Sequence, residues 1–173
     1  VWRIGPEGWQ RMGEPDAEVA RWTLRCCAWD PPRDRLVIWG FDGDADSRLA
    51  ERTAVWASGS FSRLEAGSVL PAGDKFLRGD LDNQMVFDTH HQAVVFVGAK
   101  SICLLDGDRW HPSEPGANIY RGASSGSALL LHDEGSATTL FIDTKDGWCG
   151  RLDGGNLEMA GRLRAPPDKL ATF

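Results

Sequence analysis

Short apolar stretches and polar turns alternate along the chain, and one unit of this kind occurs three times, at residues 28–40, 86–98 and 131–143. Each copy has an apolar stretch that ends in Asp30, Asp88 or Asp133, a polar turn, and a second stretch rich in β-branched and aromatic residues. Such a pattern predicts a β-hairpin. We expect the aspartate to close the turn with its own side chain.

A second element follows each hairpin, and a fourth copy of it opens the chain. It consists of an apolar stretch, a Gly or Asp turn and a large apolar anchor residue, and the four anchors are Trp9, Phe61, Trp110 and Leu157. These anchors are 52, 49 and 47 residues apart. Four short strands that recur at this interval predict an all-β fold made of β-propeller blades. A β-sandwich is the alternative, although its strands need not repeat in sequence. Residues 17–22 and 48–52 suit loops or a turn of helix.

The repeated residues resemble the kelch and galactose-oxidase-like β-propellers. In that family a blade has a hairpin that ends in a hydrophobic run and glycines, a variable loop, and an apolar strand with a turn leading to Trp. The matching runs are 37–40, 95–98 and 140–143, followed by Phe61, Trp110 and Leu157. The resemblance implies about three and a half four-stranded antiparallel blades.

The predicted units are a half blade at residues 1–13 and blades at about 21–66, 83–114 and 126–160, while 161–173 lead into a further blade. An open stack of blades leaves two faces uncovered. If each exposes on the order of 500 Å² of apolar surface, about 10 kcal/mol of stabilisation is lost per face. We therefore expect this chain to be part of a larger propeller polypeptide, with a half-propeller that homodimerises as the alternative.

Composition narrows the classes of partner. The formal net charge is -6 and no basic run could neutralise successive phosphates, so nucleic acid is not expected as a partner. No apolar stretch approaches the ~20 residues that span a bilayer. The cysteines lack a CxxC spacing, and Cys26 and Cys27 should point to opposite faces of a strand. We expect a cytoplasmic protein.

One acidic loop has the spacing of a calcium site. Asp42, Asp44 and Asp46 alternate along the loop in the way that hard cations use oxygen ligands, but Ser47 and Thr53 break the full EF-hand pattern. No cofactor is expected, because a solvated acidic loop is the simpler interpretation, and calcium is the cation that this loop could bind. His132 and the pair His90 and His91 occupy matching regions of two blades, so adjacent blades could bring them together.

The longest loops between strands span residues 40–53, 66–84 and 112–127, and loops carry function on such scaffolds. Their candidate binding residues are Asp44, Arg48, Arg78, Tyr120 and Arg121. The sequence predicts a non-catalytic module that binds a protein, or a glycan, as part of a larger bacterial-type protein or assembly. The enzyme alternative is a segment of a propeller hydrolase, lyase or oxidase with its active site at the central axis, and no catalytic residue is assigned. The eight tryptophans are expected mainly between blades.

Overall fold

The chain is all-β in the computed structural model, which describes residues 2–14, 17, 19–42, 50–64, 84–97, 102–112, 128–143, 148–153 and 156–162. Besides strands, these ranges contain two single turns of 3-10 helix, η1 (Val19–Arg21) and η2 (Pro31–Arg33). Within them, no helix has the length and apolar character needed to cross a membrane.

Three four-stranded antiparallel sheets follow one another along the chain, and each strand pairs with its neighbours in sequence. The first sheet comprises β3 (Thr23–Asp30), β4 (Arg35–Asp42), β5 (Ala50–Ala57) and β6 (Ser60–Arg63). The second comprises β7 (Gln84–Asp88), β8 (Ala93–Val97), β9 (Ile102–Asp106) and β10 (Arg109–Pro112). The third comprises β11 (Ala128–Asp133), β12 (Thr138–Asp143), β13 (Trp148–Asp153) and β14 (Asn156–Arg162). A two-stranded sheet of β1 (Trp2–Gly5) and β2 (Gly8–Arg11) precedes them.

The three predicted hairpins are confirmed as the antiparallel pairs β3–β4, β7–β8 and β11–β12. The pairs of the second predicted element are confirmed as well, because Phe61 lies opposite Trp56 and Trp110 lies opposite Leu105. The expectation of a loop or helical turn holds for η1 but is wrong at residues 50–52, which belong to β5. Their backbone pairs with residues 40–42 of β4, so sheet pairing overrides the polar local sequence.

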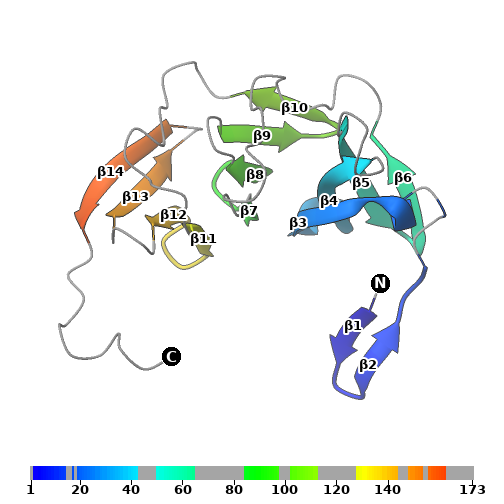
Figure 1. Cartoon of the computed structure of the whole chain (residues 1–173). Coiled ribbons are helices and arrows are strands. Elements are labelled where there is room, and N and C mark those ends of the chain that lie inside the picture. Colours follow the sequence, from blue (N-terminus) through cyan, green and yellow to red (C-terminus); the bar gives the residue numbers. More distant parts are fainter. Residues whose placement is uncertain are drawn as a thin grey trace, which may run out of the picture.

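The sheets stand side by side along an arc, with their first strands on its inner side and their fourth strands outermost (Figure 1). The first strands touch in turn, since β3 contacts β7 and β7 contacts β11. The second sheet therefore has a neighbour on both faces, while the first and third sheets each have one such neighbour within the described part of the chain.

An aromatic core lies between the first and second sheets. Trp39 packs against Phe96 with ring centroids 4.9 Å apart, and Phe96 packs edge-on against Trp110 at 6.0 Å. The indole Nε1 of Trp110 donates a hydrogen bond of 2.9 Å to the Thr53 hydroxyl, so this buried polar atom is satisfied across the interface. Burial of Trp22, Trp39, Trp56 and Trp110 agrees with the expected core role of tryptophan, whereas Trp9, Trp29 and Trp148 are exposed.

A smaller aliphatic core lies between the second and third sheets. The second sheet contributes Val95, Val97 and Ile102, and the third contributes Leu130, Phe141 and Leu152. Successive residues of β8 thus alternate between the two cores, because side chains of a strand alternate between its faces. This alternation makes the central strand of the chain an almost continuous apolar run.

The first hairpin of every sheet has the same turn. Its last residue adopts a left-handed backbone, with φ of 47° at Asp34, 52° at Gln92 and 50° at Ala137. Each of these residues lies four positions after the aspartate that ends the first strand of its repeat, Asp30, Asp88 or Asp133. The alanine side chain cannot form the local hydrogen bond by which asparagine or aspartate stabilises this conformation, so Ala137 carries backbone strain.

We expect Ala137→Gly to raise the free energy of unfolding by roughly 0.5–1 kcal/mol, because glycine adopts positive φ without a steric cost. Urea denaturation followed by circular dichroism measures the change. Ala93→Gly, in a buried strand position, is the matched control and should destabilise the protein. A loss of stability in the Ala137 variant would contradict this account.

A β-bulge in β3 brings two backbones close together. The register with β4 shifts between Leu24 and Cys26, and the guanidinium of the intervening Arg25 lies 5.6 Å from the centre of the Phe41 ring. A Cβ atom on Gly40 would lie 2.5 Å from the carbonyl oxygen of Thr23. Glycine is therefore required at position 40 by the close approach of the two strands.

Gly40→Ala should lower the free energy of unfolding by about 1–3 kcal/mol, since the methyl group meets rigid backbone. The control is Gly135→Ala, where the nearest atom to the added Cβ is the Asp133 carboxylate at 3.4 Å. Thermal unfolding of the two variants should separate them clearly, and equal effects would show that the bulge accommodates a side chain.

Candidate functional site

Arg35 links the first hairpin to the second sheet, and a buried ion pair with Asp30 holds it in place. Arg35 Nε donates to the Asp30 carboxylate at 2.9 Å, and Arg35 Nη1 reaches Asp108 at 2.6 Å, in the turn between β9 and β10. Arg35 Nη2 also donates to the carbonyl of Gly107. Asp30 is 1% exposed, so loss of its partner would leave an uncompensated buried charge.

Asp30 does not close its own turn, contrary to the expectation. The following Pro31 and Pro32 have no N–H to donate, so its carboxylate accepts hydrogen bonds from arginine side chains instead. Asp88 and Asp133 do close their turns. Asp88 Oδ1 accepts from the backbone N–H groups of His90 and His91, and Asp133 Oδ1 accepts from Gly135 N–H.

Asp88 also joins the second sheet to the third. Its Oδ2 accepts a hydrogen bond of 2.8 Å from the Thr139 hydroxyl, and the carboxylate is 2% exposed. Burial on its own would raise the pKa of Asp88. Hydrogen bonds from His91, Thr139 and the two backbone N–H groups outweigh burial and hold the pKa below its ordinary value.

His132 extends this network and is fixed as one tautomer by it. Thr139 donates its hydroxyl proton to Asp88, so it accepts at its oxygen from Nδ1–H of His132 at 2.8 Å. Nε2 of His132 in turn accepts from the backbone N–H of Thr89 at 3.2 Å. Both ring nitrogens are engaged in holding the two sheets together, with no lone pair free to bind a metal.

The predicted convergence of histidines is therefore only partly right. Adjacent sheets do bring His132 to the β7–β8 turn, but it contacts Thr89 of that turn. His91 instead lies beside Asp88, at 3.1 Å between Nδ1 and Oδ2. Among the residues that the structure describes, no three His, Cys, Asp or Glu side chains are grouped as a metal site.

These contacts define a common edge of the three sheets, which we call the turn edge. It is formed by the turns β3–β4, β7–β8, β9–β10 and β11–β12, whose residues meet across the sheet interfaces. Because neighbouring strands are antiparallel, the connections β4–β5, β6–β7, β8–β9 and β10–β11 leave from the opposite edge. We call this opposite side the loop edge.

The candidate residues of the sequence analysis follow strands that end at the loop edge. Asp42 is the last residue of β4. Asp44, Asp46, Arg48, Arg78, Tyr120 and Arg121 lie outside the described residues. The calcium loop and the binding set therefore stay predictions, and the structure adds that the strands flanking them end at one side of the molecule.

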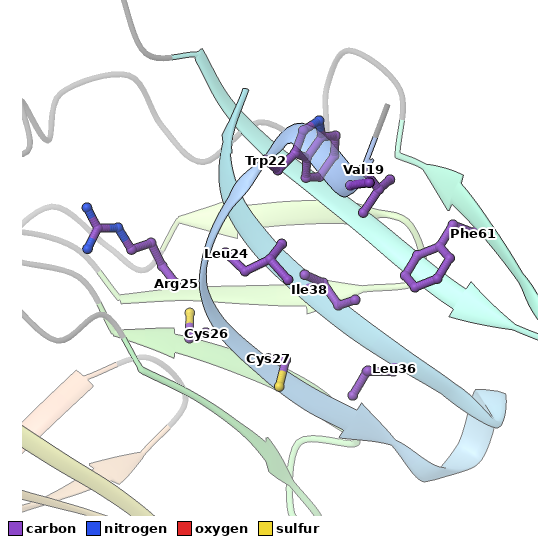
Figure 2. A pocket seen from close by; sticks show the side chains of 10 residues that line it. Val19, Trp22, Leu24, Arg25, Cys26, Cys27, Leu36, Ile38 and Phe61 are labelled. Carbon is purple, nitrogen blue, oxygen red and sulfur yellow. The ribbon is translucent and has the colours of Figure 1, made fainter. Parts of the chain in front are cut away.

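An apolar groove lies on the face of the first sheet that is turned away from the second. It has a volume of about 480 Å³ and lies between η1 and strands β3, β4 and β6. Val19 of η1 and the following Trp22 lie over the strands, whose Leu36 and Ile38 form the floor, with Phe61 at one side (Figure 2). Sequence patterns did not reveal this groove, because it depends on where the segment before β3 folds back.

The two adjacent cysteines of β3 separate as predicted. Cys26 packs against the aromatic core, whereas Cys27 is exposed in the groove. Partial desolvation by the surrounding side chains raises the pKa of both thiols, and the proximity of Cys27 raises the pKa of Cys26 further. Both thiols are therefore protonated at neutral pH and are poor nucleophiles.

Asp88→Asn should destabilise the protein at pH 7 by about 1–3 kcal/mol, because the charged acceptor of the network is lost. A lowered pKa in the folded state stabilises the protein above the ordinary pKa, 3.8 for this carboxyl, and this contribution is lost as the pH falls below it. The difference in unfolding free energy between wild type and variant should thus shrink from pH 6 to pH 3. Asp34→Asn is the control for an exposed turn carboxylate. A constant difference would contradict the assigned role.

Comparison with known proteins adds no family to this geometry. No protein-family model, curated protein or solved structure gives a significant match to the chain.

Proposed function

We propose that the three sheets are consecutive blades of a kelch-like β-propeller, and that the chain is a non-catalytic module that binds a protein partner as part of a larger protein or assembly. Support for the blades comes from the up-and-down strand order, the contacts between successive first strands and the packing of one sheet face on the next. Each sheet repeats the same turn geometry, as repeated blades would.

The observation that carries the binding role is a difference between the two edges: contacts between sheets lie at the turn edge, and the long connections lie at the loop edge. At the turn edge, Arg35, Asp88 and His132 form contacts between sheets, and Asp30 holds Arg35 from within the first hairpin. Such residues stabilise the scaffold. The long connections β4–β5, β6–β7 and β10–β11 start and end at the loop edge, which is where a rigid scaffold presents variable segments to a partner.

The acid–base groups described also suit a structural role. A His, Thr and Asp chain can serve catalysis when it ends at an exposed nucleophile. Here Nε2 of His132 contacts the hydroxyl and the backbone N–H of the half-buried Thr89 across the sheet interface, at 2.7 and 3.2 Å. Thr139, between His132 and Asp88, is fully buried. We therefore assign His132, Thr139 and Asp88 to the interface between sheets.

The test compares two charge reversals of the same type on opposite edges. Arg121→Glu changes the segment between β10 and β11, and Arg109→Glu changes an exposed residue at the turn edge. Partners copurified with the full-length protein from its own cells are quantified by mass spectrometry for both variants. We expect Arg121→Glu to deplete a partner at least tenfold and Arg109→Glu to leave it unchanged. Equal recovery with both variants would overturn the assignment of the loop edge.

A further inference from the structure

The two outer faces of the sheet stack carry apolar residues, and the equivalent residues of the other repeats are buried between sheets. Superposing the repeats on Asp30, Asp88 and Asp133 places Leu36 and Ile38 of the first sheet at the positions of Val94 and Phe96 in the second. Val94 and Phe96 are buried against the preceding sheet. Leu36 and Ile38 instead face away from the second sheet, where Val19 and Trp22 cover part of the face. The rest of this face is the groove, which the exposed Cys27 of β3 also lines.

The other end of the stack shows the complementary situation. Leu129 and Leu131 of β11 are 39% and 44% exposed. The counterparts of Leu131 are Ala28 of β3, which is buried against the following sheet, and Val86 of β7, which packs on the aliphatic core. The counterpart of Leu129 in β3, Cys26, packs against the aromatic core. Leu140 of β12 likewise occupies the position of Val37 and Val95, which are buried in the two cores.

The two outer faces therefore correspond to the two sides of the interface that joins successive sheets. The face of the first sheet is of the type that receives a preceding sheet, and the face of the third is of the type that receives a following sheet. The interface between the first and second sheets and that between the second and third each join one face of either type. A second copy of the chain presents both types, so it can pack on the part of either face that the described residues leave open.

From this equivalence we propose that two copies associate head to tail, with the β11–β14 face of one copy on the β3–β6 face of the other. The groove of about 480 Å³ beside Leu36 and Ile38 receives the leucines of the partner's β11. Trp29, which is 42% exposed on β3, lies on the same face as Cys27 and is covered as well. The proposal rests on the blade arrangement of the proposed function and adds the partner for its end faces.

Head-to-tail contact has a signature that a symmetric contact lacks. Leu131→Lys blocks only the third-sheet face, and Trp29→Lys blocks only the first-sheet face. Each variant alone should be monomeric, because every contact needs both faces. A mixture of the two variants restores one interface, because the Leu131→Lys chain keeps its first-sheet face and the Trp29→Lys chain keeps its third-sheet face.

The experiment measures molar mass by size-exclusion chromatography with light scattering, over a hundredfold range of concentration. We expect the wild type, and the exposed turn variant Glu134→Lys, to reach a multiple of 19.0 kDa. The two face variants should each elute at 19.0 kDa and form a one-to-one complex when mixed. Circular dichroism confirms that both variants, which alter exposed side chains, are folded.

Two results would overturn the proposal. A wild-type chain that stays at 19.0 kDa throughout excludes self-association. Self-association without complementation in the mixture excludes the head-to-tail arrangement. Neither result affects the comparison of Arg121 with Arg109, so failure of this inference is distinguishable from failure of the proposed binding role.

Discussion

Each four-stranded sheet in this chain carries apolar side chains on both of its faces, and that constraint governs how the sheets are arranged. Burial of such side chains contributes roughly 25 cal/mol per Å² of apolar surface removed from water. The second sheet satisfies the requirement completely, since Val94 and Val95, adjacent in β8, are buried on opposite sides. Within the described residues, the first and third sheets each pack against a neighbouring sheet on one face only.

Polar contacts at the turn edge decide how the apolar faces are aligned. Apolar packing tolerates sliding, but the Arg35 guanidinium meets Asp30 and Asp108 in one position only. The Thr139 hydroxyl does the same at the next interface, between Asp88 and His132. Different residues thus fix equivalent interfaces at the turn edge.

Local patterns in the sequence predicted the hairpins well because strand alternation and turn residues are determined by neighbours along the chain. Contacts between sheets could not be predicted from local sequence patterns, because they join residues that are far apart along the chain. The bond from Trp110 to Thr53 joins residues that share no motif, and the engagement of Asp30 by Arg35 depends on two prolines that remove the usual donors. The polar stretch at residues 50–52 became a strand because β4 offers it a complete ladder. The groove needs η1 folded over β3, which no periodicity encodes.

The pairing of every strand with its sequence neighbours has a consequence for how the molecule forms. Each sheet closes only short loops, such as the turn at residues 58–59 within β5–β6, so a sheet can assemble without waiting for distant segments. Stability then passes from sheet to sheet through their shared faces, as in a one-dimensional array. Folding can then begin at any of the three sheets and spread to its neighbours. Among the described residues the second sheet shares both faces, so it should be the last of the three to open.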